Sequence, residues 1–247
     1  MNKSTLKTLE ILEIIASSKK GMTISEISKE LEIPRSSVDD IVKALLKKEY
    51  IYQESEENKR YILGNKILEL SLSVKNKREI IDVVNPFLKK LNEEYNETIF
   101  LALKDGDYVL YVGKIESTKN IKITAVLGSK KSLYYTGLGK AILSTFTEKE
   151  IEEYIQRIKL VAKTKYTIID PYKLKKDILE AKERGYSKDY REGDEDISCV
   201  AAPLFQDGKV IGAISIAGLY GNVSENEMKK RGEKIKEVAN KISILLG

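Results

Sequence analysis

The segment TISEISKELEIPRSSVDDIVKALLKKEY, residues 23–50, constrains the fold of this chain more than any other segment. Its apolar residues recur at helical spacing in two short runs. Thr23, followed three residues later by Glu26, has the sequence pattern of a capping box and marks the start of the first run. Pro34 lies at the break between the runs and suits the first position of a second helix, because that position needs no N–H. The segment therefore predicts two short amphipathic helices joined by a tight break.

The second of these helices carries a polar face on its first turns. Its apolar positions are Val38, Ile41, Val42, Leu45 and Leu46. Its outward positions are Arg35, Ser36, Ser37, Asp39, Asp40 and Lys43. Small and polar side chains on the first turns of a second helix suit insertion into the major groove of DNA. An ordinary helical hairpin inside a core has the same apolar pattern, so the two helices alone leave both interpretations open.

A predicted β-hairpin follows the second helix directly. Residues 50–53 alternate like a strand, residues 54–59 are polar, and residues 60–63 return as a second strand before Gly64. A hairpin in this place corresponds to the wing of a winged helix-turn-helix, which favours DNA binding over a core hairpin. We therefore expect contacts to double-stranded DNA from the outward positions of the second helix, from Thr23, and from Lys59 and Arg60 on the wing.

Net charge adds little to this hypothesis. Residues 1–66 hold twelve Lys and Arg against eleven Asp and Glu, a net charge of +1, so phosphate contacts must come from local clustering. Lys59 and Arg60 could equally form part of a solvated face. Asp39 and Asp40 are unusual on such a helix because carboxylates repel phosphate, although either can accept a hydrogen bond from cytosine N4.

The composition argues against several classes of function. The chain has no histidine and a single cysteine in 247 residues. This removes the usual general base, the Ser–His and Cys–His nucleophile pairs and the commonest zinc ligand, so we expect no enzyme, no cofactor and no metal site. The single cysteine predicts a cytoplasmic protein. We also expect no membrane contact, because the sequence has neither a signal-peptide core nor an apolar run of membrane-spanning length.

The segments beside the predicted DNA-binding part suggest how the chain is divided. Residues 5–18 predict a first helix that would complete a three-helix core. Residues 65–75 predict another helix, whose apolar positions are too dense for a single apolar stripe. Either a second helix or a partner chain covers this helix, or it merely caps the N-terminal domain. Residues 76–79 form a polar seam. We expect a winged helix-turn-helix domain over 1–64, a linker helix at a dimer interface over 65–77, and a C-terminal domain over 78–247.

Beyond the seam, strands joined by hairpin turns alternate with helices. Strands are predicted over 98–103, 108–115, 121–127, 198–205 and 210–217. Helices are predicted over 80–95, 138–146, 147–158, 171–184 and 225–246. Consecutive strands joined by hairpins, with helices gathered at the ends and crossovers, are typical of an antiparallel α+β domain.

Three places in the C-terminal domain suit a ligand pocket. The turn Gly137-Leu138-Gly139-Lys140 lacks the features of a P-loop, but its backbone N–H groups could hold a carboxylate, unless the glycines serve only close packing. Asp189 stands before a polar loop and is either a surface carboxylate or a ligand contact. Cys199 lies in an apolar run, which suits a buried pocket wall and not a nucleophile.

Several motifs spread along the chain are similar to those of one family. They are RYILG at 60–64, YTGLGKA at 135–141, GY at 185–186, CVAAPLF at 199–205 and GAISI at 212–216. With these motifs in this order, the chain resembles the IclR family of bacterial transcriptional regulators over essentially its whole length.

This resemblance implies a winged helix-turn-helix domain, a linker helix and a C-terminal GAF-like domain that binds a small effector. Family members typically bind palindromic operators as dimers or tetramers, and act as repressors or, in some cases, as activators. The resemblance places effector contacts at Gly137, Leu138, Asp189, Ile197, Cys199 and Ser215. Tyr134 replaces a frequent histidine and Ala217 a frequent serine, which leaves the identity of the effector open.

Our hypothesis is therefore an effector-controlled, sequence-specific repressor of catabolic or transport genes. It would bind double-stranded DNA as a homodimer or a dimer of dimers, and its effector would be a small organic molecule such as a carboxylate or a sugar acid. The alternative is a GAF-type redox enzyme or sensor that uses Cys199, with the helix-turn-helix as a protein-interaction module. A single cysteine without a resolving partner argues against this alternative.

Overall fold

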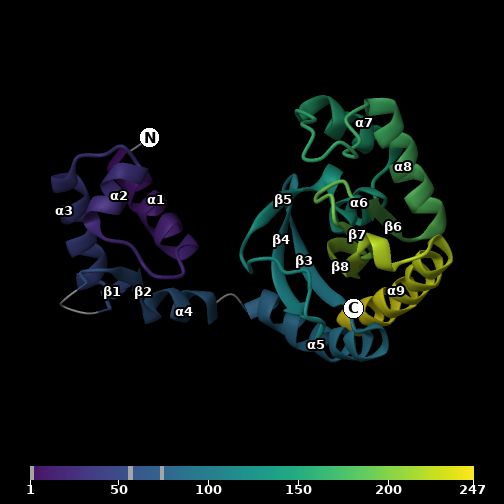
Figure 1. Cartoon of the computed structure of the whole chain (residues 1–247), viewed down its shortest axis with the longest axis horizontal. Coiled ribbons are helices and arrows are strands. Elements are labelled where there is room, and N and C mark those ends of the chain that lie inside the picture. Colours follow the sequence, from purple (N-terminus) through teal and green to yellow (C-terminus); the bar gives the residue numbers. More distant parts are fainter. Residues whose placement is uncertain (1–2, 55–57, 73–74) are drawn as a thin grey trace. The chain divides into compact units, whose positions relative to one another are not determined.

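A computed structural model describes residues 3–54, 58–72 and 75–247 of the chain (Figure 1). Backbone contacts divide the chain into two compact units, Met1–Arg78 and Glu79–Gly247. Each unit has its own hydrophobic core, as expected for separate domains of this size, and each is described by itself.

The N-terminal unit is a winged helix-turn-helix, as predicted. Its elements are α1 (Lys3–Ser17), α2 (Ile24–Glu30), α3 (Arg35–Lys47), β1 (Ile51–Gln53), β2 (Tyr61–Leu63) and α4 (Asn65–Leu72). The predicted capping box is present: the Thr23 N–H donates to Glu26 Oε2 at 2.8 Å, and the Glu26 N–H donates to Thr23 Oγ1 at 3.2 Å. Pro34 is the N-cap of α3 and therefore stands one residue before the position predicted for it.

The apolar stripes of the three helices meet in one core with the wing. This core contains Ile11 and Ile15 of α1, Ile27 of α2, and Val38 and Val42 of α3, all almost fully buried. The two wing strands pair antiparallel, and a further bridge between Met22 and Tyr61 joins the wing to the turn before α2. The wing is thereby held against the helices. Residues 55–57 of the predicted polar segment lie outside the described residues.

The C-terminal unit is built on a six-stranded antiparallel sheet in the order β5-β4-β3-β8-β7-β6. Its strands are β3 (Thr98–Asp105), β4 (Tyr108–Ile115), β5 (Lys130–Ser132), β6 (Ser187–Tyr190), β7 (Ile197–Gln206) and β8 (Lys209–Leu219). Its helices are α5 (Lys75–Tyr95), α6 (Gly137–Leu143), α7 (Glu148–Arg157), α8 (Pro171–Arg184) and α9 (Glu225–Leu246), with short 3₁₀ turns η1 (Leu133–Tyr135) and η2 (Tyr220–Asn222). The predicted antiparallel α+β class is confirmed.

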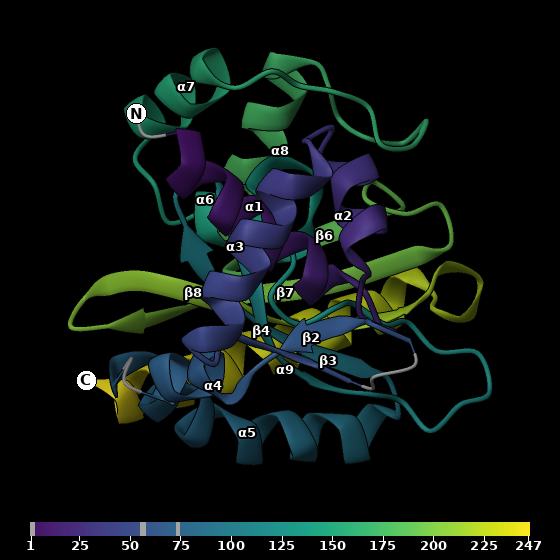
Figure 2. The same cartoon turned by 90° about the vertical axis from the view of Figure 1, so that its left-hand side faces the viewer.

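The sheet separates two cores, because successive side chains of a strand point to opposite faces. On β3, Ile99 and Leu101 pack toward α5 and α9, whereas Phe100 and Ala102 pack toward α6. Figures 1 and 2 show α5 and α9 together on one face of the sheet and α6, α7 and α8 on the other. The core on the α6 side contains the pocket described below.

The predicted strand over 121–127 is wrong. These residues form no strand, and the third strand of this region, β5, begins only at Lys130. Ile121 and Val126 are 70% and 68% exposed, and the backbone oxygen of Ile123 accepts a hydrogen bond from the Thr98 side chain instead of from a neighbouring strand. Three consecutive residues of the segment, Ile123, Thr124 and Ala125, line the pocket, so an unpaired stretch of chain carries the alternating sequence.

The predicted linker helix over 65–77 corresponds to α4 and the first residues of α5, with residues 73–74 outside the described part. The polar seam at 76–79 lies within α5, which begins at Lys75 and continues through Pro86 to Tyr95. Leu68 on α4 is 58% exposed within this chain. The assignment of α4 to a dimer interface stays a prediction.

Candidate nucleic-acid interface and ligand pocket

The polar face of α3 is open to solvent and forms one groove with the wing. The groove is lined by Arg35, Ser36 and Asp39 of α3, by Ile24 of α2, and by Gln53, Lys59 and Tyr61 of the wing. Arg35, Ser36, Asp40 and Lys43 are exposed, and Ser37 is half-buried. The groove therefore brings three of the predicted helix positions together with Lys59, whereas Ser37, Asp40 and Lys43 do not line it. Gln53 is a groove residue that the sequence motifs did not indicate.

Charges on this face are partly compensated. Lys43 Nζ lies 2.6 Å from Asp39 Oδ2, one helical turn away, and the hydrogen bond and charge of Asp39 raise the pKa of Lys43. Asp39 and Lys43 therefore form a nearly neutral pair on the exposed surface. Arg35 and Lys59 are the exposed cations at the two sides of the groove.

Thr23 and Arg60 are occupied by contacts within the protein. The Arg60 guanidinium donates to the Gly21 carbonyl through Nη1 and to Glu26 Oε1 through Nη2, both at 2.7 Å. The Thr23 hydroxyl is part of the capping box of α2. These contacts hold the wing against the start of α2. Thr23 and Arg60 therefore have a structural role, which their positions in the sequence did not indicate.

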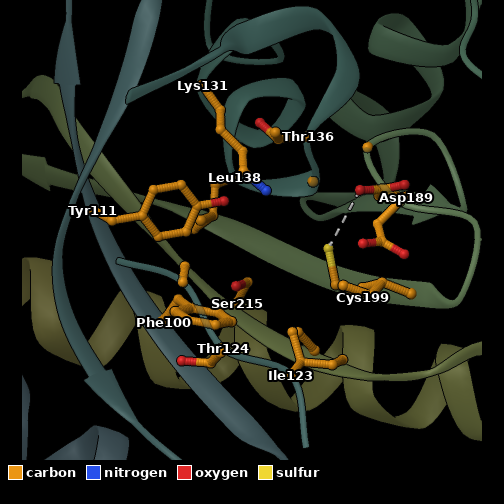
Figure 3. Close-up of a pocket in the computed structure, with 16 residues that line it drawn as sticks. Phe100, Tyr111, Ile123, Thr124, Lys131, Thr136, Leu138, Asp189, Cys199 and Ser215 are labelled. Carbon is orange, nitrogen blue, oxygen red and sulfur yellow. Dashed lines mark hydrogen bonds between the residues drawn. The ribbon is translucent and has the colours of Figure 1, made fainter. Parts of the chain in front are cut away.

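The C-terminal unit holds a cavity of about 50 Å³ between the sheet and the start of α6 (Figure 3). All six positions implied by the family resemblance line it: Gly137, Leu138, Asp189, Ile197, Cys199 and Ser215. They come from α6, β6, β7 and β8, which lie far apart in the sequence, and the fold brings them together.

Other residues of the wall were not predicted. Phe100 and Tyr111 contribute two aromatic rings in an edge-to-face arrangement, with centroids 5.5 Å apart. Lys131 and Thr136 add polar groups. Phe100 and Tyr111 lie in correctly predicted strands, so alternation could have placed them on one face, but nothing in the sequence distinguishes the pocket end of that face.

The acidic side of the pocket is tightly packed around Gly137. Asp189 Oδ1 accepts the N–H of Glu192 at 2.9 Å, and the Cys199 thiol lies 3.9 Å from Asp189 Oδ2. A Cβ on Gly137 would stand 2.5 Å from the Cys199 sulfur, so close packing does require glycine here. Burial raises the pKa of the Asp189 carboxyl and raises the pKa of the Cys199 thiol well above its usual value, which keeps the thiol protonated.

A buried ionic cluster lies behind this side of the pocket. Lys140 of α6 is 1% exposed, and its ammonium lies 2.5 Å from Glu192 Oε1 and 2.8 Å from Asp177 Oδ2 of α8. Burial alone would lower the pKa of Lys140, but the charges of Glu192, Asp177 and Asp189 raise it instead. Burial raises the pKa of Glu192 to about 7, against the opposing effect of Lys140. Glu192 Oε2 has no hydrogen-bond partner among the described residues.

The loop between β6 and β7 closes one side of the pocket and is held from outside. Its backbone oxygens at Arg191 and Glu192 accept hydrogen bonds from Thr164 and Thr167, at 2.6 and 2.7 Å. Arg191 has a φ of +66°, and its guanidinium lies 4.2 Å from the ring centroid of Tyr166 and 4.6 Å from that of Tyr220. Gly193 and Asp194 of this loop face the pocket.

The raised pKa of Glu192 predicts a pH dependence of stability. In the unfolded chain Glu192 titrates near its ordinary value of 4.5, whereas in the folded protein its pKa is about 7. Between these values the folded protein binds more protons than the unfolded chain, so the free energy of unfolding should fall as the pH rises through this window and change little above it. Denaturant unfolding at a series of pH values measures the slope. Glu192→Gln should flatten it, and Glu195→Gln on the exposed part of the same loop should not; an unchanged slope in Glu192→Gln would contradict the assignment.

No group of three or more Asp, Glu or Cys side chains in the described part of the chain is placed to hold a metal ion. Among the described helices, none contains an apolar stretch of the length needed to span a bilayer.

Comparison with known proteins identifies the family. Residues 4–55 match the model of the IclR helix-turn-helix domain, and residues 72–244 match the model of the C-terminal domain of IclR bacterial transcriptional regulators. The chain belongs to the IclR family. It is a DNA-binding, effector-responsive transcriptional regulator, as its sequence predicts.

Individual members of the IclR family are similar along almost the full chain. The HTH-type transcriptional repressor AllR of Escherichia coli strain K12 is 30% identical over 240 residues, which cover 97% of this chain and 88% of that protein. The crystal structure of the Thermotoga maritima IclR is 32% identical, with a TM-score of 0.81 and full coverage of both chains. An IclR homologue from Microbacterium hydrocarbonoxydans, crystallised with 4-hydroxybenzoate, shares the fold at 19% identity, with a TM-score of 0.86 and 99% coverage of both chains.

Proposed function

We propose that this protein is a cytoplasmic repressor that binds a palindromic operator as a homodimer or a dimer of dimers. In this proposal the first turns of α3 enter the major groove and the wing contacts the phosphate backbone. A small organic acid in the pocket controls whether the protein binds the operators of catabolic or transport genes. The observation that carries the proposal is the exposed groove that joins Arg35 and Ser36 to Lys59. AllR is named as a repressor, and the homologue crystallised with 4-hydroxybenzoate supports an organic acid as effector.

A redox enzyme that uses Cys199 is the weaker proposal. The sequence has no second cysteine to resolve an oxidised thiol, and burial keeps the Cys199 thiol protonated. Cys199 also packs against Gly137 as part of the pocket wall. These contacts support a role in shaping the pocket and not in chemistry.

The full chain, mixed with DNA from upstream of its own gene, tests the proposed function. We expect retardation of the DNA in a gel, which unlabelled DNA of the same sequence removes and unrelated DNA does not. The logarithm of the affinity should fall linearly with the logarithm of the salt concentration. Cys199→Ser should keep operator binding and alter only the response to the effector. Equal competition by both DNAs would overturn the proposal, and loss of all activity in Cys199→Ser would favour the enzyme.

A further inference from the structure

Lys131 contributes an ammonium group to the pocket, although no motif points to it. It is half-buried on β5, and its Nζ lies 5.8 Å from the ring centroid of Tyr111. Figure 3 shows the side chain extending into the pocket between Tyr111 and Thr136. No carboxylate of the described residues lies within ion-pair distance of this ammonium, whereas the adjacent Lys130 pairs with Asp105 at 2.6 Å.

The β6 side of the same pocket has the opposite charge. Asp189 is 6% exposed and lines the pocket, and Glu192 and Asp177 lie behind it around the single ammonium of Lys140. Three carboxyl groups therefore share one buried cation. A ligand carboxylate is repelled from this side and attracted by Lys131, whereas a ligand hydroxyl can donate to the Asp189 carboxylate.

The wall between these two poles is mainly apolar. Phe100, Tyr111, Ile123 and Leu138 supply rings and methyl groups, and the Ser215 side chain lies among them in Figure 3. The cavity of about 50 Å³ is small. Besides Lys131 and Asp189, the polar side chains of the lining are Thr124, Thr136, Asp194 and Ser215. These are too few to pair every hydroxyl of a polyhydroxylated chain, so some hydroxyls would face hydrocarbon, which is unfavourable. A compact hydrocarbon body fits these walls.

We propose that Lys131 is the counter-ion of the effector carboxylate, and that the effector is a compact hydroxy-monocarboxylate with a hydrocarbon body whose hydroxyl reaches Asp189. This inference rests on the proposed use of the pocket as the effector site. It narrows the ligand from organic acids in general to those without a polyol chain, and it assigns a contact residue outside the family motifs.

Matched probes and matched lysine variants test the inference on the full chain. The first probe is 3-hydroxy-3-methylbutanoate; its amide lacks the charge, and 3,3-dimethylbutanoate replaces the hydroxyl with a methyl group. Gluconate is the polyol control. Isothermal titration measures each probe against the wild type, Lys131→Met, Lys131→Arg and the neighbouring control Lys130→Met. Thermal melting and operator retardation check that every variant is folded.

We expect the hydroxy acid to bind the wild type and Lys130→Met equally, and to bind Lys131→Met at least tenfold more weakly, because a charge-assisted contact is lost. Lys131→Arg should restore most of this affinity. The amide should not distinguish wild type from Lys131→Met, and dimethylbutanoate should bind less tightly than the hydroxy acid. Gluconate should not bind.

Three results would overturn the inference: equal affinity of Lys131→Met and wild type for the hydroxy acid, tighter binding of gluconate, or no binding of any probe to the wild type. The first result would remove Lys131 as the counter-ion, and the other two would show that the ligand class is wrong; intact operator retardation would show in each case that the proposed regulatory function stands. Absence of specific retardation in the wild type would instead remove the proposed function itself.

Discussion

Replacement of Lys140 by methionine is expected to destabilise the C-terminal unit by about 3–5 kcal/mol at pH 8, because breaking a buried ion pair leaves uncompensated charge. Glu192 and Asp177 contact the Lys140 ammonium directly, and Asp189 lies close enough for its charge to raise the Lys140 pKa. Without the cation these carboxyl groups must bind protons or remain charged in a buried site. Denaturant unfolding of the full chain measures the loss, which should shrink toward pH 5 as the carboxyl groups take up protons.

Lys149→Met provides the matched control for this variant. Lys149 is also a helical lysine near a carboxylate, but its side chain is 85% exposed and its Nζ lies 3.8 Å from Glu153. Exposed pairs of this kind contribute about 0–1 kcal/mol. If Lys140→Met cost no more than Lys149→Met, the buried cluster would not be holding the α6 side of the sheet together.

The second large effect is expected on the DNA-binding face. Arg35→Ala combined with Ser36→Ala should lower operator affinity by about 100-fold or more, since each base-edge contact contributes about 1–3 kcal/mol of discrimination. Both side chains are exposed in the groove and support no core contact, so the fold should be unchanged. Fluorescence anisotropy with operator DNA and with a scrambled duplex measures affinity and specificity together.

Lys59→Ala separates specific from nonspecific binding on the same face. If Lys59 contacts a phosphate, its loss should weaken binding to both duplexes equally. It should also reduce the slope of log affinity against log salt by about 0.9. Equal weakening of operator and scrambled DNA by the Arg35 and Ser36 double variant would show that the start of α3 contacts only the backbone.

The features that sequence predicted well are those set by local chemistry. The capping box at Thr23 and the helix that begins after Asp170 and ends at Gly185 follow from backbone groups that a nearby side chain or a left-handed residue must satisfy. The unbroken run of buried residues at the start of β3 likewise matches a strand buried on both faces, because its residues contact a core on each side.

Features that depend on distant partners could not be read in this way. The segment 121–127 alternates like a strand, but pairing requires a free neighbouring strand. Its Ile123 and Ala125 line a pocket instead, and Ile121 and Val126 are exposed. Lys131 and Lys140 have the same side chain, yet one faces the pocket and the other is fully buried against α8. Only the fold places Asp177 of α8 beside Lys140, because the two residues are far apart in the sequence.

The anchoring of the β6–β7 loop has a kinetic consequence. Arg191 is stacked between Tyr166 and Tyr220, and the loop carbonyls are bonded to Thr164 and Thr167, so the rim beside Gly193 is fixed at several points. Entry of an effector on this side requires those contacts to open together. Association by this route would be limited by the frequency of rim opening and not by diffusional encounter, and release by the same route would wait for the same opening.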